Sequence, residues 1–240
     1  MINKIKSLIQ ENRERQKLIF KQTQEITWGQ VYSDSIRGIS YLEDLSINIG
    51  RWAGNYSFFY VLNRVLMDYK PASILEFGLG ESSKFISAYL DNLLLNSRHL
   101  IIEHDENWAS SFRQRFNLSE RSHVKLFPLQ QTVVNGYESF CYKNFNESIK
   151  DKFDLYVIDG PFGSERFSRF DIVSKAKTFE PDDEFIILMD DFDRIGEKDT
   201  IEKILEELRS KNITFYSKCY EGSKAQMLIA TKKYRFAASL

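Results

Sequence analysis

The chain has 240 residues, of which 42% are hydrophobic and 28% are charged. This composition is typical of one sizeable globular domain or two small ones, and it excludes a disordered, collagen-like or disulfide-rich chain. With 33 basic and 34 acidic side chains the net charge is −1, which gives no basic field for a phosphate backbone, so no nucleic-acid partner is expected.

The N-terminal segment predicts a helix over residues 2–25, with apolar side chains at helical spacing and six Lys or Arg against three Glu. The favoured interpretation is a helix docked on the protein body or on a second subunit, which makes a homo-oligomer through this helix an expected partner. A peripheral membrane contact is disfavoured because the apolar stripe breaks between Ile9 and Leu18. Since no apolar run has the length of a membrane span and no signal peptide is evident, we expect a cytoplasmic protein.

The next segment, residues 26–54, shows no clear period and contains four glycines. It predicts a cap of short turns and helices, so that residues 1–55 form an N-terminal helical extension. An apolar helix is then expected over residues 55–69, ended by Pro71. We expect residues 56–240 to form the main domain.

From Pro71 onward, apolar runs of strand length alternate with helical segments, which predicts a parallel sheet with helices on both faces. The last two strands are joined only by Glu221–Lys224, too short for a crossover helix, so the last strand should be antiparallel. The expected fold class is α/β: a Rossmann-like, seven-stranded, mostly parallel sheet with an N-terminal helical cap. The expected strands are 73–77, 99–103, 124–128, 155–159, 185–189, 213–216 and 227–231, and the expected helices are 82–95, 106–117, 165–179 and 199–211.

A glycine turn follows the first of these strands, in the run Ile74-Leu75-Glu76-Phe77-Gly78-Leu79-Gly80. Glycines at 78 and 80 let the backbone turn tightly and approach a ligand, and the free amides of the next helix can face it. The second strand ends in Glu103, where nucleotide-binding α/β proteins hold ribose hydroxyls. A purely structural turn and a solvated strand end are the alternatives.

This run, together with Glu103 and the terminal hairpin, resembles the class I S-adenosylmethionine-dependent methyltransferases over roughly residues 56–232. The resemblance implies that Glu76 lies beside the methionine part of the cofactor, that Gly78 and Gly80 pass under it, and that Glu103 holds its ribose. Ser82 stands where the family often has a third glycine, and it is small enough to serve as a cofactor-binding residue too.

Two later strands also end in acid, at Asp159 and at the pair Asp190 and Asp191. Carboxyl ends of parallel strands share one edge, and three carboxylates there need a cation or a proton. Oxygen ligands suit Mg²⁺ or another hard divalent cation. The placement resembles metal-dependent O-methyltransferases, which implies a metal on these three residues. The alternative puts Asp159 near the transferred methyl, within the cofactor site, with Asp190 and Asp191 as a solvated loop start.

Catechol-type members of that group have a lysine three residues after the first of these acids, and this chain has Phe162. The candidate catalytic bases are therefore Asp159 and His104. The phrase Val157-Ile158-Asp159-Gly160-Pro161 looks closer to glycan-modifying methyltransferases, so the expected reaction is O-methylation of a small molecule or sugar. Arg166 and Arg169 either clamp an acidic substrate or form a solvated helix face.

Two other functions remain open. An NAD(P)-dependent oxidoreductase would need the pattern Gly-x-Gly-x-x-Gly, but position 83 is Ser, and the terminal hairpin also argues against it. A non-catalytic protein with a cofactor fold would act as an assembly partner, with residues 1–25 as its docking helix.

Overall fold

The computed structural model describes residues 2–50 and 52–240, and its centre is a seven-stranded sheet in the order β3-β2-β1-β6-β7-β9-β8. Its first five strands in that order are parallel, and β9 is antiparallel to both of its neighbours. The expected fold class, with its antiparallel last strand, is thereby confirmed. The strands are β1 (Ser73–Phe77), β2 (Arg98–Glu103), β3 (Ser122–Leu126), β6 (Leu155–Ile158), β7 (Ile186–Met189), β8 (Phe215–Glu221) and β9 (Ala225–Thr231).

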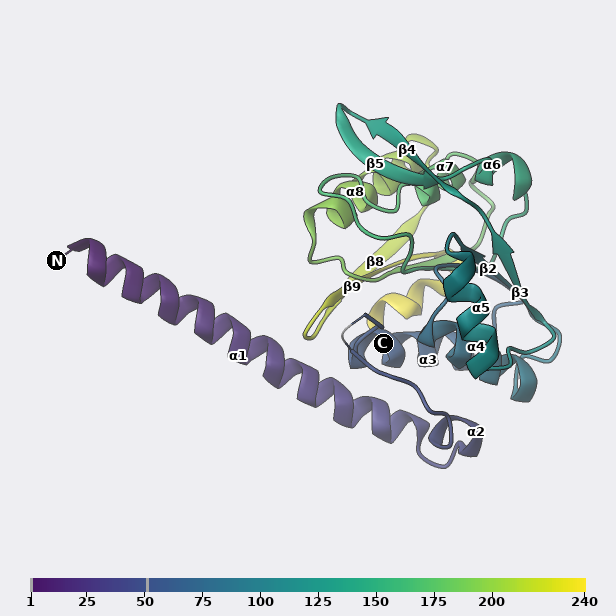
Figure 1. Cartoon of the computed structure of the whole chain (residues 1–240), viewed down its shortest axis with the longest axis horizontal. Helices are drawn as coiled ribbons and strands as arrows, with labels where there is room; N and C mark the ends of the chain where they lie inside the picture. The colour runs from purple at the N-terminus through teal and green to yellow at the C-terminus, as the bar shows by residue number, and fades with distance from the viewer. Residues whose placement is uncertain (1, 51) are drawn as a thin grey trace.

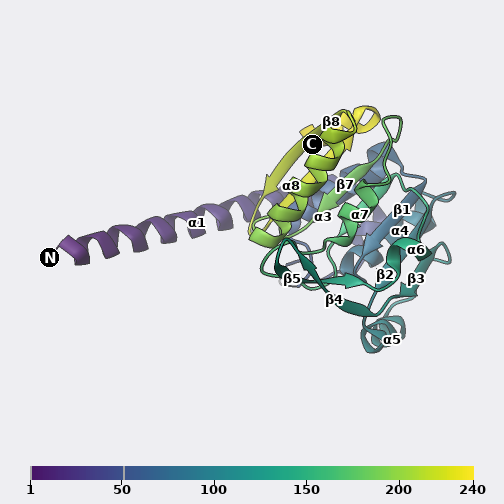
Figure 2. The same cartoon turned by 90° about the horizontal axis from the view of Figure 1, so that it is seen from above.

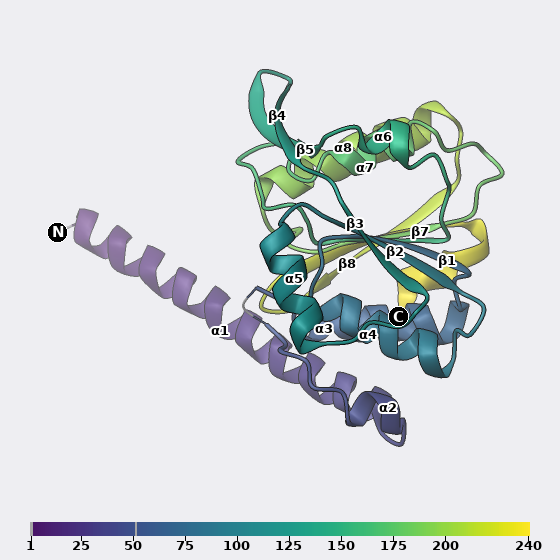
Figure 3. The same ribbon diagram turned by 45° about the vertical axis from the view of Figure 1, so that its right-hand side comes forward.

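Helices cover both faces of the sheet, giving three layers (Figure 3). Successive residues of a strand point to opposite faces, so Ile74 belongs to one core and Leu75 to the other. One face carries α3 (Tyr56–Arg64), which continues as a π-helical turn to Tyr69, and α4 (Glu81–Asn92). The other face carries α6 (Phe145–Ser148), α7 (Asp171–Ala176) and α8 (Ile195–Ser210), while α5 (Glu106–Arg115) packs beside β2.

The first helix, α1 (Ile2–Ile36), is a single element whose N-terminal half projects from the domain (Figures 1 and 2). Residues 4–20 are all exposed, and docking of this half on a second subunit stays a prediction. Among the described residues, no helix combines the length and the apolar character that a membrane crossing requires.

The expected end of this helix at residue 25 is wrong, because the helix continues for three more turns along α3. Trp28 explains the continuation: its ring lies 5.3 Å from that of Tyr60, and its indole N–H donates to the carbonyl of Glu221 at 2.7 Å. The helix passes directly against α3 at Gly29, where a Cβ would be in van der Waals contact with the Tyr56 ring at 3.4 Å. Tertiary packing thus extends the helix beyond its apolar stripe. The cap that follows contains the short helix α2 (Ser40–Glu43).

A hairpin of β4 (Leu129–Val134) and β5 (Tyr137–Tyr142) was not expected. Its strands are exposed on much of both sides, so they show no buried alternation. The turn does carry a signal: Asn135 and Gly136 both have positive φ, at 50° and 85°, as a two-residue hairpin turn requires.

The helix expected over residues 165–179 is helical only from Asp171 to Ala176. Phe167 and Arg169 have φ of 51° and 56°, which a right-handed helix excludes. The strand expected at 124–128 begins and ends two residues earlier, at Ser122–Leu126.

Replacing Trp28 by Ala should lower the free energy of unfolding by about 2–3 kcal/mol, because the ring packing and the indole hydrogen bond are both lost. Ile26→Ala is the matched control on the same helix, since Ile26 is 75% exposed. Urea unfolding followed by circular dichroism measures both variants. Equal stabilities for the two would contradict the packing described here.

Candidate active site

The glycine turn after β1 touches the end of β6. Gly78 has a φ of 97°, and a Cβ there would come 3.1 Å from the carbonyl oxygen of Asp159. A Cβ on Gly160 would come 2.8 Å from the Cα of Gly78, closer than real side chains approach. Glycine at both positions therefore lets the two strand ends meet. Gly80 has open space where its Cβ would be, so its backbone is accessible to a ligand.

Glu103, at the end of β2, fixes this turn through hydrogen bonds. One of its carboxylate oxygens accepts from the backbone N–H of Leu79 at 2.9 Å. The other accepts from the N–H groups of His104 and Asp105, at 2.6 and 2.9 Å. The His104 Nδ1 lies 2.9 Å from the same oxygen, so His104 and Glu103 form one polar unit beside the turn.

Glu76 lies beneath the turn and not on the cavity wall, because its side chain is fully buried. The Ser83 hydroxyl donates to Glu76 Oε2 at 2.7 Å and accepts from the N–H of Gly80 at 3.0 Å. Histidine 99 completes the cluster: its Nε2 lies 3.0 Å from Glu76 Oε2, and its Nδ1 lies 3.0 Å from the Ser122 hydroxyl. His99 was not identified from the sequence as part of this site, because it stands at the start of the second strand with no motif around it.

Above the turn lies a cavity of about 960 Å³. Its volume falls at the upper end of the usual range for small-molecule and cofactor sites. Aromatic residues border it: Trp108 donates its indole N–H to the Leu79 carbonyl at 2.7 Å, and the 96% exposed Trp52 lies at the rim. Six of the seven cofactor or catalytic candidates line this cavity: Gly78, Gly80, Ser82, Glu103, His104 and Asp159.

The three predicted acids do come together. Asp159, Asp190 and Asp191 each have a carboxylate oxygen within 4.8 Å of the others. The positively charged side chains of one arginine and one lysine lie between them. The Arg169 guanidinium lies 3.1 Å from Asp159 and 2.8 Å from Asp191, and the Lys224 ammonium lies 3.3 Å from Asp191 and 3.5 Å from Asp190.

Burial and these neighbouring charges shift the pKa values of the three aspartates in different directions. Burial, and then the charge of Asp190, raise the pKa of Asp159 to about 8. Burial also raises the pKa of Asp190. For Asp191 burial acts in the same direction, but Arg169, Lys224 and Arg194 outweigh it and hold its pKa below the ordinary value. Asp191 is therefore the permanent anion of the cluster.

A divalent cation fits this cluster poorly. Hard cations bind carboxylate oxygens at about 2.0–2.6 Å, which would place two positive charges directly beside the guanidinium of Arg169. That guanidinium is held in place, since Arg169 is 4% exposed and donates to the carbonyl of Asp190 at 3.1 Å. Arg169 is thus neither a substrate clamp nor part of a solvated face, while Arg166 pairs at the surface with Asp199.

Comparisons with known proteins found no matching family model and no matching curated sequence. Solved structures do match. The O-methyltransferase TomG from Streptomyces achromogenes, in complex with SAM, is 11% identical and aligns with a TM-score of 0.55 over 88% of this chain and 96% of its own. The chain has the class I methyltransferase fold. A Klebsiella pneumoniae protein described as an O-methyltransferase is 13% identical and aligns with a TM-score of 0.51 over 84% and 89%.

Arg169→Met should lower the free energy of unfolding by about 3 kcal/mol or more at neutral pH, because it leaves buried carboxylates without their cation. The loss should shrink toward pH 5. Carboxylates whose folded pKa is raised destabilise the fold as pH rises above their unfolded pKa, so acid relieves the penalty. Arg166→Met, at the surface pair, is the matched control and should leave the free energy of unfolding nearly unchanged. Urea unfolding at both pH values measures this, and a pH-independent loss would contradict it.

Proposed function

We propose that the protein transfers a methyl group from S-adenosylmethionine to an oxygen of a small molecule or glycan. The observation that carries the proposal is the single cavity that joins the open backbone at Gly80, the carboxylate of Glu103 and the carboxylate of Asp159. The fold, shared with solved O-methyltransferases, supports the same conclusion.

The cofactor would be held by the glycine turn and by Glu103. The carboxylate of Glu103 has about four acceptor sites, so its three backbone bonds leave room for a ribose hydroxyl at Oε2. Ser82, at the start of α4, adds a hydroxyl to the wall. Glu76 and Ser83 would act as positioning residues that hold the backbone of Gly80 from below. When bound, S-adenosylmethionine supplies an electrophilic methyl group on a positively charged sulfur.

Asp159 is the proposed base for the acceptor hydroxyl. It lies on the cavity wall, and a pKa near the working pH makes a carboxylate a stronger proton acceptor than an ordinary aspartate. Arg169, 3.1 Å away, fixes the direction of the carboxylate. His104 is the second candidate; its ring packs against Phe162 with centroids 5.1 Å apart, at the same wall.

We propose that this site needs no divalent cation. Arg169 and Lys224 would neutralise the acids that bind a metal ion in metal-dependent O-methyltransferases. Both cations already lie within 3.5 Å of the acids that the sequence indicated as metal ligands. The rate enhancement would then come from aligning the methyl donor with the acceptor hydroxyl and from excluding water.

Calorimetric titration with S-adenosylhomocysteine tests the cofactor assignment. The wild-type protein should bind it, and Glu103→Ala should weaken binding by about tenfold or more, because a hydroxyl acceptor and the anchor of Leu79 are both lost. Glu106→Ala, an exposed acid at the start of the neighbouring helix α5, should bind as the wild type does. Binding of NADH in place of S-adenosylhomocysteine would contradict the proposal.

Metal removal should have no effect on this affinity. Titrations in EDTA and in Mg²⁺ should give the same dissociation constant, and Mn²⁺ titrated into the protein should give no saturable heat. Saturable Mn²⁺ binding that Asp190→Asn abolishes would show that a metal binds at the three aspartates and would contradict the proposal.

A further inference from the structure

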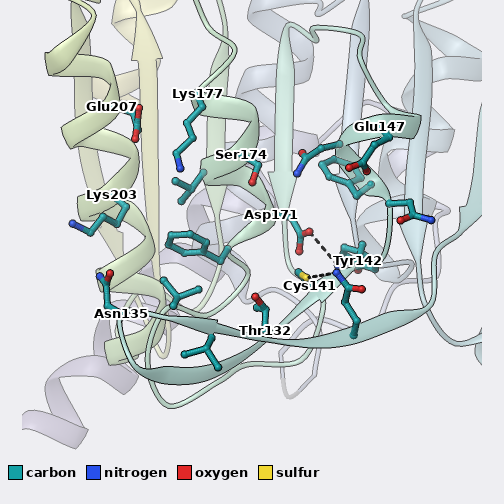
Figure 4. A pocket seen from close by; sticks show the side chains of 18 of the residues that line it. Thr132, Asn135, Cys141, Tyr142, Glu147, Asp171, Ser174, Lys177, Lys203 and Glu207 are labelled. Atoms are coloured by element: carbon teal, nitrogen blue, oxygen red, sulfur yellow. Dashed lines mark hydrogen bonds between the residues drawn. The ribbon is translucent and has the colours of Figure 1, made fainter.

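We propose that the cavity beneath the β4–β5 hairpin is a second binding site, and that its ligand is a neutral, hydroxyl-rich molecule of the saccharide class. The cavity measures about 630 Å³, is partly open to solvent, and is lined by the hairpin, α6, α7 and α8 (Figure 4). That volume accommodates one or two sugar rings.

Asp171 supplies the strongest sign of a ligand. Its side chain is 5% exposed and lines the cavity, where one carboxylate oxygen accepts from the backbone N–H of Tyr142 at 3.1 Å. The other oxygen, Oδ2, is buried without a hydrogen-bond partner among the described residues. A buried polar atom left unpaired costs free energy, so a ligand hydroxyl that donates to it would recover that cost. Burial also raises the pKa of Asp171 to about 7, which favours a neutral partner.

The rest of the wall shares this hydrogen-bonding character. Six of the polar side chains on the wall are amides or hydroxyls, which bind uncharged polar ligands. These residues are Gln130, Thr132, Asn135, Asn144, Asn146 and Ser174.

Charges on the wall are mixed in sign, which disfavours a strongly charged ligand of either sign. Two lysines, Lys177 and Lys203, face three glutamates, and Lys203 already pairs with Glu206 at 2.6 Å. The remaining charged side chains, Lys177, Glu147 and Glu207, are of both signs, so an anion in the cavity would meet acidic groups and a cation would meet a basic one. A neutral polyhydroxylated molecule makes use of the amides and hydroxyls without displacing an ion pair.

The two cavities are neighbours through Tyr142, which lines both of them. Its hydroxyl is buried and, among the described residues, has no hydrogen-bond partner. The second site is therefore separate from the glycine turn but adjoins the wall that carries Glu103 and Asp159.

A nuclear magnetic resonance titration without any methyl donor tests the site independently of the proposed reaction. The probes are glucose, galactose, N-acetylglucosamine and sucrose, with glucose 6-phosphate and spermidine as charged contrasts. At least one neutral sugar should shift the backbone amides of residues 129–142 and 171–176, and leave those of residues 78–82 unchanged. Shifts from the charged probes alone, shifts at the glycine turn, or no shift with any neutral sugar would overturn the proposal.

Substitutions on the cavity wall test whether the sugar binds in this cavity. Asp171→Asn keeps an acceptor for the Tyr142 N–H but removes the carboxylate, and it should weaken binding of the sugar by about tenfold. Ser174→Ala tests the same wall through a half-buried hydroxyl, should the first variant fail to fold. Ser110→Ala, on the exposed face of α5, is the control and should bind as the wild type does. Wild-type affinity in both cavity variants would overturn the proposal.

Discussion

The buried guanidinium of Arg169 allows three carboxylates to lie together beside one edge of the sheet. Asp159 and Asp191 lie within 3.1 Å of it, and Glu197 lies 3.6 Å from its Nε. Unscreened acids at such distances repel strongly, and most of the repulsion would have to be relieved by protonation. The irregular loop before α7 follows from this requirement, because the positive φ of Arg169 belongs to a turn that brings the side chain inward.

The site also depends on a close contact between the ends of β1 and β6. Gly78 and Gly160 meet without side chains, which brings the turn after β1 and the end of β6 against one another. The acids around this contact then have different tasks. Glu76 is buried and holds the turn from below, Glu103 anchors it from the side, and Asp159 reaches the cavity. In the proposed reaction, one edge of the sheet would thus supply a positioning residue, a cofactor-binding group and a proton acceptor.

Periodicity predicts the sheet well because each parallel strand is buried on both faces, which leaves apolar runs that are unambiguous in the sequence. Placement of Glu103 and Asp159 followed from the same regularity, since residues at the carboxyl ends of parallel strands share an edge. The cations were harder to place. Arg169 follows β6 in a loop, Lys224 belongs to the terminal hairpin, and only the folded chain brings them together. Local pattern likewise missed the end of α1 and the exposed β4–β5 hairpin, since the packing of Trp28 and the turn at Asn135 determine them.

A crystal structure of the protein with S-adenosylhomocysteine and Mn²⁺, with anomalous data recorded, tests the central claim most directly. We predict cofactor density along the glycine turn with its ribose at Glu103, and Arg169 still bound to Asp159 and Asp191 with no anomalous peak between them. A manganese peak among the three aspartates with Arg169 displaced, or a cofactor bound elsewhere, would contradict the account.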